Sequence, residues 1–271
     1  MRIGINHVPS HSNPEEWADI LVKEGYRATV FPVNYLAKDS VIGAYVKAAT
    51  DRDILLAEIG IWDSPFQKDP VKAEMVVEKS YRSLELADHV GASCCVNVSG
   101  GTGDPWYFLD KGNFGDEIYQ RNVEFIQTLL DKVKPKNTYF TLEPMQWMLP
   151  DSPEQYAQLI RDVNRERFAV HMDIVNWVKD PYSYTHQEEL IDQAYSLLGP
   201  QIRSCHLKDC RLDVGLTVAI REVLLGEGDV PIRYYLEQIN KLDPDMPVLL
   251  EHLPDMDAYL RAKKNIDKIW L

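Results

Sequence analysis

The sequence predicts one closed (β/α)8 TIM barrel over residues 1–271, and three observations support this fold class. Short β-rich runs alternate with longer helical segments along the whole chain. Eight such units follow one another without a linker, and this alternation implies a parallel sheet with helical crossovers. A chain of 271 residues has the length typical of such a barrel. The alternative, an open doubly wound sheet, usually carries a glycine fingerprint after its first strand, and "INHVPSHSN" has no G-x-G.

The individual elements follow from local signals. A helix is expected to open at Asn13, because this N-cap residue precedes a proline and two glutamates that suit the positive end of a helix. The helix expected over 69–89 has apolar residues at helical spacing and ends before Gly91. The eight expected strands are 2–7, 27–32, 54–62, 92–99, 138–145, 168–175, 202–208 and 247–252. The other expected helices are 38–53, 117–133, one opening at 152, 187–198, 218–225, 232–240 and 256–269.

Composition excludes several classes of protein. The net charge of −13 argues against binding to nucleic acid or to an anionic membrane, which needs clustered lysine and arginine. No apolar run approaches the ~18 residues of a membrane span, and the N-terminal residues show no secretory signal. The four cysteines match no zinc motif, so free thiols in a reducing cytoplasm are expected.

Polar side chains end four consecutive strands. Strand 138–145 delivers Glu143, strand 168–175 delivers Asp173, and strand 202–208 delivers His206; Glu251 lies at the end of the last strand. Taken singly, such a residue is more often an ion-pair member, a helix cap or a hydrogen-bonded core residue. In a barrel, however, the C-terminal strand ends meet at one face and build the active site. Three carboxylates and one imidazole therefore predict a divalent-metal site suited to Mn²⁺, with Mg²⁺ or Co²⁺ as alternatives.

Five motifs then carry a family resemblance. The stretches "TLEP", "HMDIVN", "CHLKD", "GEGDV" and "LLEH" resemble the signatures of the xylose-isomerase-like barrel superfamily. The nearest group is that of sugar phosphate isomerases and epimerases, which includes ketose 3-epimerases and hydroxypyruvate isomerases. The resemblance implies that Glu143, Asp173, His206 and Glu251 hold the metal, and that the two glutamates also act as the acid/base pair. It leaves a homo-oligomer open, since members often form dimers or tetramers.

Two features near these motifs need separate interpretation. Epimerases of the group usually carry a histidine three residues after the aspartate that corresponds to Asp173, and this chain has Asn176 there. His171 shares a strand face with Asp173, and we expect a buried histidine whose hydrogen bonds are satisfied. The "GEGDV" loop is interpreted as structural support, with a phosphate cradle as the alternative.

The expected reaction is isomerisation or epimerisation of a small sugar or keto-sugar. One glutamate removes the proton beside a carbonyl, the metal stabilises the resulting cis-enediolate, and a proton is returned. Further substrate contacts are predicted at His7, Trp62, Trp106, Asn176, Lys208 and Arg211. The simpler alternatives are that the aromatic residues only plug the barrel mouth and that Lys208 pairs with Asp173 or Asp209 as scaffold.

Other functions on the same scaffold are also considered. A lyase or dehydratase acting on a keto-sugar, cyclitol or C-glycoside shares the proton abstraction but expels a leaving group. An apurinic endonuclease needs more histidines and a basic groove, which the acidic composition disfavours. A binding barrel without catalysis has no need for two opposed glutamates.

Overall fold

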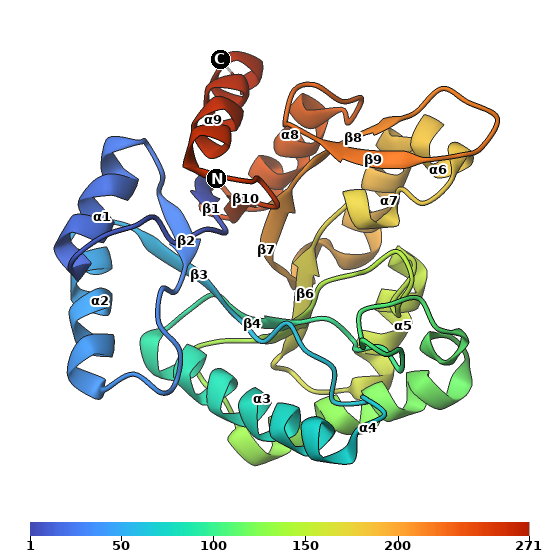
Figure 1. The fold of residues 1–271 in the computed structure, drawn as a ribbon, viewed down its shortest axis with the longest axis horizontal. Coiled ribbons are helices and arrows are strands. Elements are labelled where there is room, and N and C mark those ends of the chain that lie inside the picture. The colour runs from blue at the N-terminus through green and yellow to red at the C-terminus, as the bar shows by residue number, and fades with distance from the viewer. Residues whose placement is uncertain (271) are drawn as a thin grey trace.

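Eight parallel strands close into a barrel in the computed structural model, which describes residues 1–270. The helices surround this ring of strands (Figure 1). The strand order around the barrel is β1-β10-β7-β6-β5-β4-β3-β2, with β1 paired to both β2 and β10. The barrel strands are β1 (Arg2–Ile5), β2 (Ala28–Val30), β3 (Leu55–Gly60), β4 (Cys94–Asn97), β5 (Phe140–Leu142), β6 (Phe168–Met172), β7 (Ile202–Leu207) and β10 (Pro247–Leu250). The predicted fold class is confirmed.

The helices lie where the sequence predicted them, with two exceptions described below. They are α1 (Pro14–Lys23), α2 (Asp39–Asp51), α3 (Pro70–Val90), α4 (Asp116–Val133), α5 (Pro153–Val163), α6 (Pro181–Thr185), α7 (Gln187–Leu198), α8 (Ile232–Leu242) and α9 (Met256–Trp270). Short 3-10 turns span Lys111–Asn113, Val175–Trp177 and Gly199–Gln201. None of the helices in the described part is long and apolar enough to cross a membrane.

The helix ends show why these segments form. The Asn13 side chain accepts a hydrogen bond from the Glu16 amide, which satisfies one of the free amides at the start of α1. Gly91 ends α3 in the left-handed conformation, with φ of 70°, a region that glycine adopts without steric cost. The buried faces of these helices pack on the outside of the barrel and form the main hydrophobic core.

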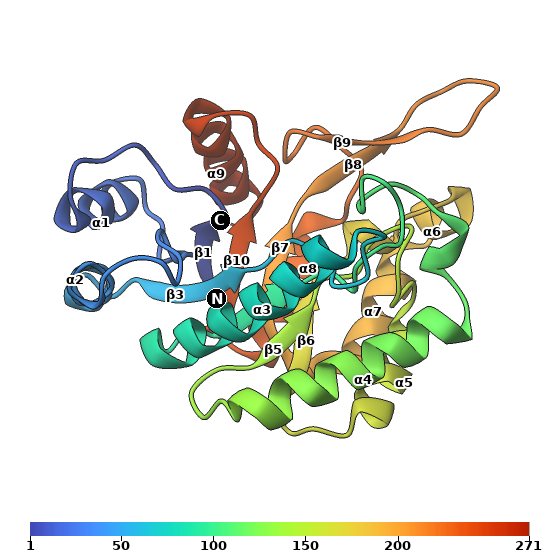
Figure 2. The same ribbon diagram turned by 60° about the horizontal axis from the view of Figure 1, so that its bottom comes forward.

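A two-stranded antiparallel sheet interrupts the seventh βα unit, between β7 and α8. Strands β8 (Asp209–Leu212) and β9 (Ile220–Val223) form a hairpin that projects from the barrel (Figure 2). The helix predicted over 218–225 is therefore wrong, because pairing with the segment after β7 decides the structure of this short run. Helix α6 was not predicted.

The barrel strands are shorter than predicted. Most of the polar side chains therefore lie just after a strand and not within it. Glu143, Asp173, Lys208 and Glu251 each lie one residue beyond the end of a strand, whereas His206 lies within β7. All four cysteines are buried and have free thiols, as the sequence predicted.

Candidate metal centre

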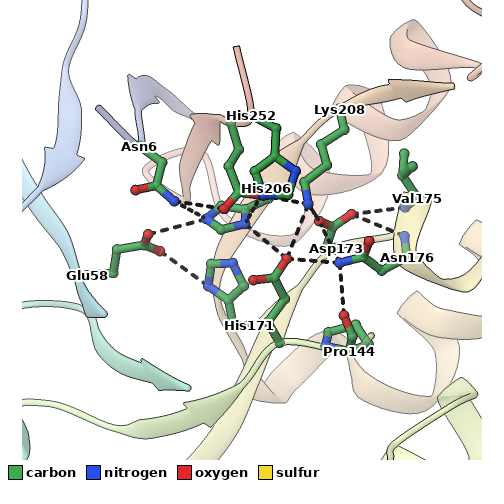
Figure 3. Close-up of polar contacts among 12 residues, drawn as sticks. Asn6, Glu58, Pro144, His171, Asp173, Val175, Asn176, His206, Lys208 and His252 are labelled. Atoms are coloured by element: carbon green, nitrogen blue, oxygen red, sulfur yellow. Dashed lines mark hydrogen bonds and ion pairs between the residues drawn. The ribbon is translucent and has the colours of Figure 1, made fainter. Parts of the chain in front are cut away.

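The four predicted metal ligands come together at the mouth of the barrel. One donor atom each of Glu143, Asp173, His206 and Glu251 lies within 4.8 Å of the others. The side chains reach this place from β5, β6, β7 and β10, and they are 0–8% exposed. Figure 3 shows Asp173 and His206 in their polar surroundings. Their convergence follows from the parallel barrel, which brings the ends of neighbouring strands to the same level.

The ammonium group of Lys208 lies among the three carboxylates. Its Nζ is 2.7 Å from Asp173 Oδ2, 2.6 Å from Glu251 Oε2 and 3.4 Å from Glu143 Oε1. Lys208 is only 3% exposed, so these contacts replace most of its hydration. The predicted pairing with Asp173 is thus present. The ammonium supplies positive charge to the same carboxylates that a divalent cation would bind.

The electrostatic surroundings give the three carboxyl groups different pKa values. Burial and the nearby Glu251 carboxylate raise the pKa of Glu143 to about 7. Burial opposes ionisation of Glu251 too, but His206 and Lys208 outweigh it and hold the pKa of Glu251 well below its usual range. Burial likewise opposes ionisation of Asp173, whose pKa is nevertheless lowered because the Lys208 ammonium lies beside it. Glu143 is therefore the carboxyl group of this set that takes up a proton most readily.

Asn176 holds two of the carboxylates in place. Its Nδ2 donates to Glu143 Oε1 at 3.0 Å, to Asp173 Oδ2 at 3.1 Å and to the Pro144 carbonyl at 2.9 Å. Asp173 Oδ1 in turn accepts from the Val175 amide at 3.1 Å and the Asn176 amide at 3.4 Å, where the chain turns into the 3-10 helix. Asn176 thus acts in the observed geometry as a positioning residue for the carboxylates.

His206 links the mouth of the barrel to its interior. Its Nδ1 lies 3.0 Å from Glu251 Oε2 and 3.3 Å from Glu143 Oε1. Its Nε2 lies 3.3 Å from Glu58 Oε1 and 3.4 Å from Asn6 Nδ2. Burial opposes protonation of the ring, but the neighbouring carboxylates raise the pKa of His206 well above its usual value.

Three residues of this network were missed in the sequence. Glu58 interrupts the apolar strand "LLAEIG", and this interruption was the available signal. Asn6 donates to Glu251 Oε1 at 2.9 Å, yet it directly follows β1, beside the more conspicuous His7. His252 contacts Glu251 Oε2 at 3.5 Å and Glu222 Oε2 at 3.0 Å, with an unusual positive φ of 56°.

The remaining predicted substrate contacts lie at different distances from the cluster. The Trp62 ring centroid is 6.1 Å from that of His206, so Trp62 borders the site. His7 stacks on Tyr259 instead, with ring centroids 5.3 Å apart. Trp106 lines a separate cavity with Tyr35 and Asp63. Arg211 is exposed on β8, so its role in binding substrate stays a prediction, as do those of His7 and Trp106.

The "GEGDV" loop is anchored to the end of β7 by Asp209. The Asp209 carboxylate accepts hydrogen bonds from the amides of Gly226, Gly228 and Val230 at 2.8, 2.9 and 3.1 Å, and from that of Cys210 at 2.9 Å. Amides that already donate to a carboxylate are not free to bind phosphate. The geometry therefore favours the structural interpretation of this loop.

The donor set fits a divalent cation. Three carboxylates and one imidazole nitrogen are the ligands that Mn²⁺, Mg²⁺ and Co²⁺ accept, and burying three carboxylates together requires positive charge beside them. Glu143, Asp173, His206 and Glu251 would hold the ion.

The match to a family model identifies the class of protein. Residues 18–269 match the model described as xylose isomerase-like TIM barrel, and the chain belongs to this family. No match was found among the curated proteins.

Solved structures share this architecture. A xylose isomerase-like TIM barrel protein from Mycobacterium smegmatis in complex with magnesium is 17% identical, with a TM-score of 0.71 over 99% of this chain and 95% of that one. A D-psicose 3-epimerase in the presence of D-fructose is 15% identical, with a TM-score of 0.72 over 99% and 98%. The probable 3-DHS dehydratase AsbF of Bacillus anthracis, involved in petrobactin synthesis, is 14% identical, with a TM-score of 0.74 over 98% of both chains. At these identities the likeness shows the fold alone.

Proposed function

We propose that this chain is a divalent-metal-dependent sugar isomerase or epimerase. The observation that carries the proposal is the convergence of Glu143, Asp173, His206 and Glu251 within 4.8 Å of one another. A D-psicose 3-epimerase among the similar structures supports the choice of a sugar or keto-sugar as substrate. We propose Mn²⁺ as the ion, with Mg²⁺ or Co²⁺ as alternatives.

The chain's own residues divide the chemistry between them. A bound divalent cation would act as a Lewis acid toward a carbonyl oxygen and the neighbouring hydroxyl oxygen. One of the two glutamates, Glu143 or Glu251, removes the proton from the carbon beside the carbonyl, and the other returns a proton. Asn176 keeps the Glu143 carboxylate oriented through its 3.0 Å hydrogen bond. Trp62 borders the site, where its ring would contact the bound sugar.

The test is a reaction in deuterated water with a panel of ketoses and Mn²⁺. A recovered sugar that carries solvent deuterium at the carbon beside the carbonyl supports the proposal. A dehydrated or cleaved product would instead indicate the lyase or dehydratase alternative, which shares the proton abstraction. Unchanged substrate across the panel, with metal bound, would count against both.

Variants then assign the roles. We expect Glu143→Gln and Glu251→Gln to lower turnover by about 10²–10⁴-fold, the usual contribution of an acid/base group. Bound Mn²⁺ must be measured in each variant, so that loss of chemistry is separated from loss of the ion. Glu78→Gln on the exposed face of α3 is the matched control. A metal-loaded Glu143→Gln variant that retains full turnover would refute the assignment of Glu143.

A further inference from the structure

A second cluster of ionisable side chains lies inside the barrel. Glu58 on β3, His171 on β6 and His206 on β7 are 0–1% exposed. His171 lies two residues before Asp173, so it faces the same way one layer deeper. The interior of such a barrel is ordinarily filled with branched aliphatic side chains. A carboxylate and two imidazoles there are costly to bury unless each finds a partner.

Several atoms of this cluster have no hydrogen-bond partner. Glu58 Oε2 and both ring nitrogens of His171 make no hydrogen bond among the described residues, although Glu58 Oε2 and His171 Nδ1 lie within 3.4 Å of each other. The prediction that His171 is a satisfied core histidine is therefore wrong, although the residue is buried as expected. Buried polar atoms of this kind are rare in folded proteins and indicate that something else satisfies them.

The geometry matches that of donors around one cation. Glu58 Oε2 lies 3.4 Å from His171 Nδ1, and Glu58 Oε1 lies 3.3 Å from His206 Nε2. The two imidazole rings are 4.1 Å apart between centroids, at an angle of 76°. All three side chains point toward a common place (Figure 3), and one donor atom of each lies within 4.8 Å of the others. Zn²⁺ binds such donors at ~2.0–2.2 Å, which puts tetrahedral donors ~3.4 Å apart.

We propose that Glu58, His171 and His206 form a second divalent-metal site. Two imidazoles and one carboxylate favour Zn²⁺ over the harder ions that suit the oxygen-rich cluster at the mouth. The two sites share His206 through different ring nitrogens, Nε2 toward Glu58 and Nδ1 toward Glu143 and Glu251. If both were filled, both ring nitrogens of His206 would bind a cation, and the two N–H protons of the charged ring would be released to solvent.

A count of bound metal tests this site without any substrate. The metal-stripped full chain is equilibrated with Zn²⁺, freed of excess ion and analysed for metal per chain. We expect about two ions in the wild type and in the control Glu78→Gln. The site of Glu58, His171 and His206 is called the inner site, and that of Glu143, Asp173, His206 and Glu251 the outer site. We expect one ion in Glu58→Gln and in His171→Gln, which lose the inner site. Asp173→Asn should also bind one ion, because it loses only the outer site.

Cobalt adds a spectroscopic signature. Co²⁺ at a site with two imidazoles and few ligands absorbs visible light far more strongly than Co²⁺ in an octahedral oxygen site. The strong band should persist in Asp173→Asn and disappear in Glu58→Gln and His171→Gln. If one of these variants fails to fold by circular dichroism, the other variant and the wild-type count still decide.

Two results would overturn the inner site. The first is a single ion in the wild type that Glu58→Gln and His171→Gln both retain. The second is a count of two that neither substitution changes. Either would mean that Glu58 and His171 only support the His206 ring. Catalytic activity with only one ion per chain would support the proposed function and refute the inner site. Two ions per chain without activity would support the inner site and count against the proposed function.

Discussion

Replacement of Lys208 by methionine tests whether its ammonium and the metal supply the same charge. Methionine keeps an unbranched apolar side chain and removes the charge that lies 2.6 and 2.7 Å from Glu251 and Asp173. Removing one partner of a buried ion pair typically costs about 3–5 kcal/mol. We expect a loss near the lower end, about 3 kcal/mol, because Glu143 has a raised pKa and can take up a proton in compensation. For a chain of this size, this corresponds to a fall in Tm of about 6 °C.

The assay is urea and thermal unfolding in the presence of a chelator and again with saturating Mn²⁺. With chelator, Lys208→Met should unfold about 3 kcal/mol more easily than the wild type. With Mn²⁺ the difference should shrink, because the cation then neutralises the carboxylates. Lys47→Met is the control, since it removes an exposed pair with Asp51 and should change stability by less than about 1 kcal/mol. Equal stability of Lys208→Met and wild type in chelator, or equal stabilisation of both by Mn²⁺, would refute the reasoning.

Three further predictions concern the mouth of the barrel and its supporting loop. Mn²⁺ affinity should fall as pH drops below about 7, because Glu143 must lose a proton before it binds the ion and the His206 ring, whose pKa is also raised, must bind as the neutral imidazole; calorimetry in buffers of different ionisation enthalpy would show the released protons, and a flat pH profile would contradict this. Asp209→Asn should lower the free energy of unfolding by about 2 kcal/mol, because an amide group would face the four backbone amides that the carboxylate accepts from; an unchanged urea midpoint would contradict it. Gly228→Ala should cost about 1–3 kcal/mol in the same urea experiment, because its Cβ would lie 2.2 Å from Asp209 Oδ1; Gly43→Ala, where a Cβ meets nothing within 4 Å, is its control.

The sequence predicted the barrel and the outer cluster because both depend on local patterns. Strand and helix periodicity fixed the order of elements, and the end of a strand in a barrel has a known place in space. Glu143, Asp173, His206 and Glu251 could therefore be brought together without coordinates.

The missed features depend on contacts that no local pattern contains. Glu58 can be recognised as part of a site only through its contacts with His171 and His206, which lie on strands distant in the sequence. Strand β9 forms because β8 pairs with it, although its residues alone were interpreted as a helix. The direction of the His7 ring, toward Tyr259, is likewise a matter of tertiary packing.

The pairing of β1 with β10 also sets the order in which the molecule is assembled. Arg2 lies opposite Pro247 in the register of these strands, so the ring stays open until the chain has been synthesised as far as β10. Until then β1 and β7 each present an unpaired strand edge, which other chains can bind. Glu251 follows directly after β10, and the last ligand of the outer cluster thus arrives with the strand that seals the barrel.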